Sequence, residues 1–275
     1  MEIVDVVDKR GIPTGEQVER EQAHTLGIRH RTSHVWIVRR KEGRLQVLLQ
    51  KRSENKDSFP GCYDISSAGH IPAGVDFVSS AVRELKEELG CEVKTEELIY
   101  CGQRCFEFQD TFHGKVFHDN QVSNVYALWL DREPETFSLQ KEEVSEVKWF
   151  DFQECMEKVE KNEIPNCIFT EELKMVEIVA NTGIKGIVLQ EIRELARKYD
   201  INKVILFGSR ARGDFHRTSD IDLASEGGDQ TRFALDVDDQ TSTLLKFDII
   251  NLDGVVQKEL LDSIEKEGIV IYEKI

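Results

Sequence analysis

Residues 69–90 read "GHIPAGVDFVSSAVRELKEELG" and join a glycine-containing loop to a segment patterned as a helix. Apolar residues recur every three or four positions and so share one helix face. They are Val78, Val82, Leu85 and Leu89. Asp76 is placed to cap the start of this helix, and Gly90 to end it. We therefore predict an amphipathic helix over 77–89 with its apolar face buried.

Three glutamates, Glu84, Glu87 and Glu88, gather on the face beside the apolar one. A solvated acidic face is the ordinary interpretation of such a pattern. However, carboxylates this close repel one another unless a hard divalent cation joins them. The loop "SSAGHIPAG" that precedes the helix also lets a phosphate chain approach the backbone. Together these features predict a magnesium site for a diphosphate.

The segment resembles the Nudix box, with Gly69 followed by Arg-Glu-Leu at 83–85, Glu-Glu at 87–88 and a closing glycine. The resemblance covers roughly residues 1–170 and implies an α/β/α sandwich. It implies that Glu84, Glu87 and Glu88 bind Mg2+ (or Mn2+), that Arg83 orients the helix, and that Gly69 and His70 contact the substrate. The implied reaction is attack of water on a nucleoside diphosphate linked to another group.

The chain departs from this family at Val75, where the family usually has a supporting glutamate. The flanking stretch "LLQKRSENKDSFPGCYDISSAGH" also resembles a Nudix branch that is compared with isopentenyl diphosphate isomerases. Those enzymes transfer protons with a cysteine and a glutamate, and this chain has Ala68 and Gln121 at these positions. An isomerase-like enzyme is the alternative function for this half of the chain.

Four histidines resemble in spacing those that bind the second metal of the isomerases. They are His24, His30, His34 and His70. A lone histidine usually has a structural, hydrogen-bonding role, whereas four near one loop indicate a metal site.

A second stretch, "VILFGSRARGDFHRTSDIDLA" at 204–224, places ten residues between Gly208-Ser209 and Asp220. Asp220 and Asp222 alternate along a predicted strand and so share one face. Asp248 lies in another apolar strand, "KFDIINL", where a carboxylate without a partner is costly to bury. We predict that the three acids converge and hold two magnesium ions.

This pattern resembles the DNA polymerase β-like nucleotidyltransferases, and the short length is similar to the minimal members, including antitoxins paired with HEPN toxins. The resemblance implies that Asp220 and Asp222 bind both metals. Asp248 would complete one metal site and help to deprotonate the attacking hydroxyl. Gly208 and Ser209 would hold the triphosphate of the substrate.

Arg210 and Arg212 follow the Gly-Ser turn. Since arginine recognises phosphate with two parallel hydrogen bonds, we expect both side chains beside the β- and γ-phosphates. Ordinary solubility of a surface loop is the alternative for either arginine.

The chain has 275 residues, which is more than one domain usually contains. Helical patterns alternate with short apolar strands after the glycines of "NTGIKG" at 181–186. We predict an α/β protein of two domains: a Nudix α/β/α sandwich over 1–180 and a minimal nucleotidyltransferase α/β fold over 181–275. A hairpin is predicted within 35–49, with its turn at Glu42-Gly43.

The net charge of −16 argues against nonspecific binding to nucleic acid, because such binding depends on clustered lysine and arginine. Binding of nucleotides together with a divalent metal ion is compatible with this negative charge. Six cysteines without a CxxC pattern indicate reduced thiols, and no apolar run reaches the roughly 20 residues of a membrane span. We expect a cytoplasmic protein with no membrane contact.

The sequence therefore predicts a bifunctional enzyme that cleaves a nucleoside diphosphate compound and transfers a nucleotidyl group from an NTP to an unknown acceptor. A regulatory, nucleotide-sensing or antitoxin-like module with one inactive domain is the other alternative. In both cases a protein is a candidate acceptor or partner.

Overall fold

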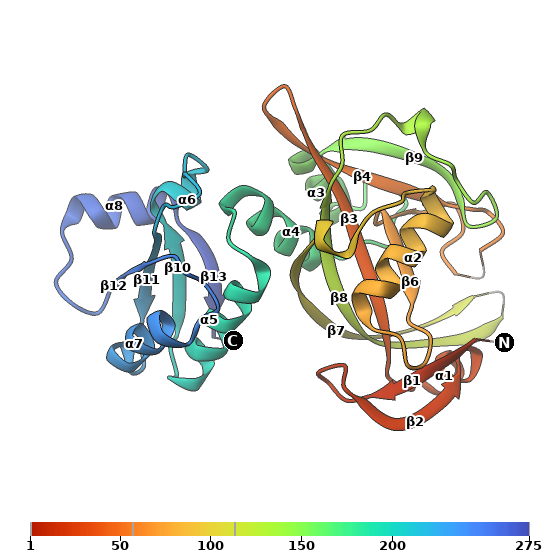
Figure 1. Ribbon diagram of the computed structural model, residues 1–275, viewed down its shortest axis with the longest axis horizontal. Helices are drawn as coiled ribbons and strands as arrows, with labels where there is room; N and C mark the ends of the chain where they lie inside the picture. The colour runs from red at the N-terminus through yellow and green to blue at the C-terminus, as the bar shows by residue number, and fades with distance from the viewer. Residues whose placement is uncertain (1, 57, 113, 275) are drawn as a thin grey trace. The chain divides into compact units, whose positions relative to one another are not determined.

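The computed structural model describes residues 2–56, 58–112 and 114–274. Contacts between residues divide the chain into unit 1, Met1–Val176, and unit 2, Glu177–Ile275. The division lies inside helix α4, Thr170–Thr182, so the predicted boundary after residue 180 falls near the end of the same helix. Figure 1 shows both units.

Unit 1 contains a mixed sheet in the order β5-β4-β3-β8-β7, with β6 paired to β3 and β9 paired to β4. Its elements are β1 Ile3–Val7, β2 Pro13–Glu19, α1 Arg20–Leu26, β3 His30–Lys41, β4 Arg44–Arg52, β5 Tyr63–Asp64, β6 Ser67–His70, α2 Phe77–Leu89, β7 Leu98–Phe112, β8 Lys115–Trp129, β9 Val144–Asp151, α3 Phe152–Glu160 and α4. Short 3-10 turns precede β7 and β9. Strand β3 is parallel to β8 and antiparallel to β4 and β6, while β1 and β2 form a separate antiparallel pair.

The predicted hairpin is confirmed by the pairing of Lys41 with Arg44 across the turn between β3 and β4. Both turn residues have positive φ, 53° at Glu42 and 78° at Gly43. This is the left-handed geometry that matches the twist of the flanking strands.

The predicted amphipathic helix is confirmed as α2. The Asp76 side chain accepts a hydrogen bond from the Ser79 amide at 2.9 Å, and Gly90 ends the helix in the left-handed conformation at φ 64°. Leu85 and Leu89 are fully buried in the core that α2 forms with the central sheet. Since the apolar face is fixed on the sheet, the neighbouring glutamates are held close to β6.

The stretch between β9 and the end of α4 contains two helices, α3 and α4, which are separated by residues 161–169. This intervening segment pairs with β5: the Tyr63 amide donates to the Pro165 carbonyl at 2.8 Å, and the Cys167 amide donates to the Tyr63 carbonyl at 3.0 Å. The backbone groups thus find partners on a strand instead of within a helix, and Pro165 has no amide to continue a helix.

Unit 2 has a four-stranded sheet in the order β12-β11-β10-β13. Its elements are α5 Gly186–Lys198, β10 Lys203–Phe207, α6 Gly208–Arg212, β11 Ile221–Glu226, α7 Gln230–Gln240, β12 Phe247–Asn251, α8 Lys258–Glu267 and β13 Ile269–Glu273. Strands β11 and β12 are parallel and joined through α7, and the other pairs are antiparallel. Among the helices of the described residues, none has both the length and the apolar character that crossing a bilayer requires.

Candidate functional site

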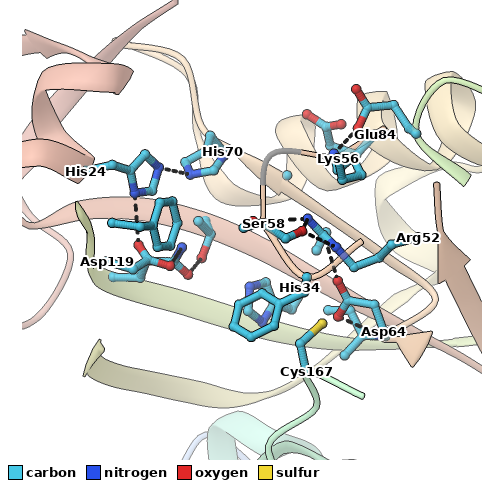
Figure 2. A pocket seen from close by; sticks show the side chains of 18 of the residues that line it. His24, His34, Arg52, Lys56, Ser58, Asp64, His70, Glu84, Asp119 and Cys167 are labelled. Carbon is cyan, nitrogen blue, oxygen red and sulfur yellow. Dashed lines mark hydrogen bonds and ion pairs between the residues drawn. The ribbon is translucent and has the colours of Figure 1, made fainter. Parts of the chain in front are cut away.

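A pocket of about 1010 Å³ in unit 1 is lined by residues from α1, β6, α2, β7 and β8 and from the loops beside them (Figure 2). Part of its lining is charged and includes Arg52, Lys56, Glu84 and Glu88. Another part is aromatic: Phe59, Phe106, Phe108, Phe112, Phe117 and Phe169. The pocket therefore offers both a charged surface for phosphate and metal and an apolar surface for a second group.

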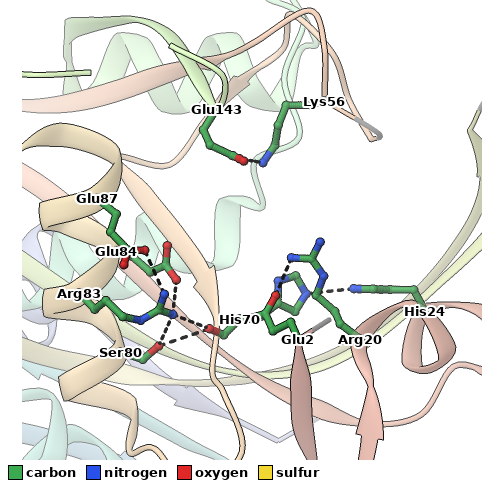
Figure 3. Close-up of polar contacts among 10 residues, drawn as sticks. All are labelled: Glu2, Arg20, His24, Lys56, His70, Ser80, Arg83, Glu84, Glu87 and Glu143. Atoms are coloured by element: carbon green, nitrogen blue, oxygen red, sulfur yellow. Dashed lines mark hydrogen bonds and ion pairs between the residues drawn. The ribbon is translucent and has the colours of Figure 1, made fainter. Parts of the chain in front are cut away.

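Strand β6 and helix α2 meet closely at Gly69. A Cβ at this position would lie 2.1 Å from Cδ of Glu84, so the absence of a side chain allows the Glu84 carboxylate to lie against the strand. Arg83 donates to Glu84 Oε1 at 2.5 Å, to Glu87 Oε2 at 3.0 Å and to the His70 carbonyl at 3.3 Å (Figure 3). Arg83 thus holds two of the three glutamates and ties α2 to β6.

Glu88 is only 6% exposed and accepts a hydrogen bond from the Ser67 hydroxyl at 2.7 Å. Burial raises the pKa of Glu88 to about 8, to which the nearby Glu84 carboxylate contributes. Burial also raises the pKa of Glu84 to about 7, although Arg83 opposes this rise. The partly buried carboxylate of Glu84, which is paired with Arg83, and the buried carboxylate of Glu88 are a donor set that fits a hard divalent metal ion.

The structure does not bring all three glutamates as close together as the sequence pattern predicts. In the described part of the chain, neither these glutamates nor the three aspartates of unit 2 form a set of three donor atoms within 4.8 Å of one another. The Glu87 side chain is half exposed and turns to Arg83. The Glu87 carboxylate is repelled by the other two carboxylates and attracted by the Arg83 guanidinium, so it lies beside Arg83.

A second candidate metal site is formed by His24, His30 and His70, whose ring nitrogens lie within 4.8 Å of one another. His24 Nε2 and His70 Nε2 are 3.0 Å apart, and His24 Nδ1 lies 3.5 Å from Asp119 Oδ1. His30 Nδ1 lies 2.9 Å from the Ile28 carbonyl, so the other ring nitrogen, Nε2, is the one that can bind a metal ion. This Nε2 lies 3.7 Å from the same Asp119 oxygen.

Among the residues that the structure describes, three buried atoms of this cluster find no hydrogen-bond partner: His24 Nδ1, His30 Nε2 and Asp119 Oδ1. Burial lowers the pKa of His24 to about 3 and raises the pKa of Asp119 to about 6. The imidazoles are therefore neutral at physiological pH, the form that binds metal ions, and the donor set fits a transition metal.

His34 does not belong to this cluster, although the sequence spacing grouped it with the other three histidines. Its Nδ1 lies 2.9 Å from Oε1 of the buried Glu172, which also accepts hydrogen bonds from Trp36 and Arg104. Burial disfavours the charged imidazole, but Glu172 raises the pKa of His34 overall. The side chain is thus committed to an ion pair.

Ala68 and Gln121, which stand at the positions of the proton-transferring residues in the isomerase resemblance, both line the pocket. The Gln121 amide donates to Asp119 Oδ2 at 2.6 Å, and its oxygen accepts from the Thr32 hydroxyl at 3.1 Å. Neither a methyl group nor this amide can transfer a proton to an alkene.

Sequence reasoning missed two cations of the pocket, Arg52 and Lys56. Arg52 donates to Asp64 at 2.8 Å and to the Ser58 carbonyl at 2.9 Å, while Lys56 is paired with Glu143 (Figures 2 and 3). Both lie in the flanking stretch "LLQKRSENKDS", but the pattern of that stretch does not reveal which of its three basic residues face the pocket.

In unit 2, the parallel pairing of β11 and β12 places Asp222 directly opposite Asp248, and Asp220 immediately precedes β11. A Cβ at Gly208 would lie 2.2 Å from Asp222 Oδ2, and the φ of Gly208 is 71°. Burial raises the pKa of Asp222, and the charges of Asp248 and Asp220 raise it further. The carboxylate oxygens of the three aspartates fit a divalent metal site that faces the Gly-Ser turn.

Arg210 and Arg212, both predicted to lie beside phosphate, have different surroundings in the structure. Arg210 is 1% exposed, and its guanidinium donates to backbone carbonyls. Arg212 is partly exposed and pairs with Asp214 and Glu267 at 3.3 and 2.8 Å. Arg210 points inward because the loop that leads from the Gly-Ser turn to Asp220 folds back over its side chain. The guanidinium nitrogens therefore reach the Ser219 carbonyl in that loop.

Comparison with known proteins agrees with this geometry. The NUDIX domain family matches residues 28–169, and the family described as Polymerase beta, Nucleotidyltransferase matches residues 190–275. Nudix hydrolase 3 of Arabidopsis thaliana is 40% identical over 200 residues, which cover 68% of this chain and 25% of the relative. An uncharacterized Nudix hydrolase of Clostridium acetobutylicum is 36% identical over 143 residues, which cover 52% of this chain and 66% of the relative.

Among solved structures, a protein of Deinococcus radiodurans covers 63% of this chain and 98% of its own, with 20% identity and a TM-score of 0.48. This chain spans a quarter of the length of the Arabidopsis relative and just under two thirds of the clostridial one. The NUDIX match covers more than half of the 275 residues. The chain therefore belongs to the Nudix family, and it carries a polymerase β-type nucleotidyltransferase domain after its Nudix domain.

Proposed function

We propose that unit 1 is a pyrophosphohydrolase that cleaves a nucleoside diphosphate linked to another group and depends on Mg2+ (or Mn2+). The observation that carries this proposal is the pair of carboxylates, partly buried Glu84 and buried Glu88, in the wall of a pocket that also contains Arg52 and Lys56. Negative groups on one element and positive groups on another suit a diphosphate bound together with its cation.

In this proposal Glu84, Glu87 and Glu88 hold the divalent cation, which polarises the diphosphate and lowers the pKa of the attacking water. Arg83 keeps two of these carboxylates in place through its hydrogen bonds. Arg52 and Lys56 attract the phosphate oxygens. The phenylalanine side chains exclude water and pack against the base or the second group of the substrate.

The experiment is phosphate release from a panel of nucleoside diphosphate conjugates with Mg2+, with coupled phosphatase to reveal monophosphate products. Glu88→Gln should reduce the rate about 100-fold or more, because it removes a buried charge that holds the cation. Glu92→Gln, on an exposed residue paired with Lys86, is the matched control. Equal rates in wild type and Glu88→Gln would exclude this site.

We propose that unit 2 transfers a nucleotidyl group from an NTP to an acceptor, with Asp220, Asp222 and Asp248 holding two divalent cations. The register of Asp222 opposite Asp248 supports this function. Gly208 and Ser209 are proposed to hold the triphosphate. Because unit 2 is compact, the proposed acceptor is a separate small molecule or a protein partner.

The test for unit 2 is transfer of label from each α-labelled NTP to protein or small acceptors. Asp220→Asn should abolish transfer, whereas Asp238→Asn, on the exposed face of α7, should leave it unchanged. Transfer that persists in Asp220→Asn would contradict the proposed site.

The histidine cluster is the observation that favours an isomerase-like alternative, while Ala68 and Gln121 oppose it. Isomerisation of isopentenyl diphosphate by the wild-type chain would establish the isomerase-like alternative. If both activities are absent, the regulatory, nucleotide-sensing function becomes the better proposal. The cytoplasmic location is also a proposal, supported by six cysteines that are free in this structure.

A further inference from the structure

Arg210 lies at the start of unit 2's metal site but does not face solvent. It is 1% exposed and is among the largest fully buried side chains of the described residues. Its Nε and Nη2 donate to the Ser219 carbonyl at 3.2 and 2.8 Å, and Nη1 donates to the Thr182 carbonyl at 2.9 Å. A fourth contact, from Nε to the Asp220 carbonyl, is 3.2 Å long. Each of the three guanidinium nitrogens therefore donates to a backbone oxygen.

The peptide group between Asp220 and Ile221 is held at both ends. Its carbonyl accepts from Arg210, and its amide donates to the Lys246 carbonyl at 2.9 Å. These two bonds hold the orientation of the peptide plane and so restrict the backbone that carries the Asp220 side chain.

The packing around Arg210 supports the same arrangement. The guanidinium carbon lies 4.9 Å from the centre of the Phe215 ring. A Cβ at Gly183 would lie 2.6 Å from this ring and 3.6 Å from Arg210 Nη1, so a residue with no side chain allows the ring to lie where it does. The ten residues between Ser209 and Asp220 thus fold back over the guanidinium, with Phe215 packed against it.

We infer that Arg210 is a positioning residue that fixes Asp220 for metal binding, rather than a ligand of the nucleotide phosphates. This inference rests on the proposed nucleotidyltransferase function of unit 2. A residue that orients a metal ligand from behind typically changes metal affinity 10- to 100-fold when it is replaced. Arg212, two residues later and partly exposed, pairs instead with the side chains of Asp214 and Glu267.

The test compares Arg210→Lys with Arg212→Lys in the full chain. Lysine keeps the positive charge, so any change reports the lost geometry: a single ammonium cannot reach the three carbonyls that the planar guanidinium spans. All proteins carry Glu84→Gln and Glu88→Gln, so that Mn2+ bound at the Nudix glutamates does not mask the site in unit 2. Asp220→Asn in the same background defines the signal from that site.

Bound Mn2+ is measured by electron paramagnetic resonance, with and without α,β-methylene ATP, and binding of this analogue is measured separately without metal. We expect Arg210→Lys to weaken the Mn2+ binding that depends on Asp220 roughly 10-fold or more. Metal-free binding of the analogue should change less than about twofold, and Arg212→Lys should leave Mn2+ binding unchanged. Phe215→Leu, which loosens the packing but removes no hydrogen bond, should weaken Mn2+ binding in the same direction by a smaller factor.

Two results would overturn the inference while the proposed function stands. One is unchanged Mn2+ affinity in a folded Arg210→Lys protein, and the other is loss of metal-free analogue binding at unchanged Mn2+ affinity, which would make Arg210 a phosphate ligand. If Arg210→Lys does not fold, unchanged Mn2+ affinity in Phe215→Leu overturns it. If Asp220→Asn removes no Mn2+ signal from the parent protein, the proposed function of unit 2 fails, and the inference fails with it.

Discussion

Replacing Glu172 by glutamine should destabilise unit 1 strongly, by an amount that depends on pH. Glu172 is 1% exposed and accepts hydrogen bonds from His34 at 2.9 Å, Trp36 at 3.2 Å and Arg104 at 3.3 Å. Glutamine keeps one acceptor oxygen but removes the anion that faces the His34 imidazole and the Arg104 guanidinium, while Arg104 keeps the exposed Glu171 as a partner. Breaking a buried ion pair from one side costs about 3–5 kcal/mol, and we expect a loss of that size near pH 6.

The pH dependence follows from both partners. The pKa of His34 is raised, so its contribution is complete below the unfolded value of 6.5 and is lost as the pH rises through the folded pKa. The pKa of Glu172 is lowered despite its burial, chiefly by the His34 charge, so its contribution is complete above 4.5 and is lost as the pH falls. The destabilisation by Glu172→Gln should therefore be largest at about pH 5–6 and smaller at pH 9, where Arg104 alone keeps its charge.

The assay is urea unfolding followed by tryptophan fluorescence. All three tryptophans, at positions 36, 129 and 149, belong to unit 1, so the signal reports the unit that contains the substitution. Glu171→Gln is the matched control, because the Glu171 side chain is 71% exposed and also pairs with Arg104. The control should cost less than about 1 kcal/mol. A cost for Glu172→Gln below 1 kcal/mol at pH 6, or one that is flat between pH 5 and pH 9, would refute this reasoning.

Three further changes test the sites directly. Gly69→Ala places a methyl group 2.1 Å from Cδ of Glu84, and because that side chain can move, we expect diphosphate hydrolysis to fall about 10-fold or more with little change in the urea midpoint. Gly208→Ala forces alanine to φ 71°, at a cost of about 1–2 kcal/mol, and should abolish label transfer while phosphate release by unit 1 continues. His70→Ala should remove the visible absorbance of Co2+ bound to the histidine cluster, whereas His216→Ala, at an exposed position of unit 2, should not alter the spectrum.

Elements with strong local patterns could be predicted from the sequence. Helix α2 combines a periodic apolar face with a cap at Asp76 and a stop at Gly90, and the hairpin turn at Glu42-Gly43 has its own turn chemistry. The strands and helices of unit 2 follow short apolar runs and amphipathic segments in the same way. By contrast, β1, β2, α1 and β7 were not predicted, since their stability depends on pairing and packing with residues distant in sequence.

Among the candidate site residues too, those that follow a local sequence pattern could be predicted, and those that depend on distant contacts could not. The spacing of Gly208, Asp220 and Asp222 reflects neighbouring strands and could be recognised from the sequence, because the alternation along a strand is regular. Spacing could not separate His34 from the histidine cluster, because two histidines on one strand can face different partners. Nor could it show that Arg210 turns inward, since this depends on the course of an irregular loop.

The strand order of unit 2 also determines when its proposed metal site can form during synthesis. Central strand β10 pairs with β11 on one side and with β13, Ile269–Glu273, on the other, and Asp248 lies on β12 between them in the sequence. Unit 1 can fold while these residues are still being added by the ribosome, because domains generally fold as units from the N-terminus. A nascent chain can therefore carry a complete Nudix pocket while the three aspartates are still apart, and cleavage activity should precede transfer activity on the growing chain.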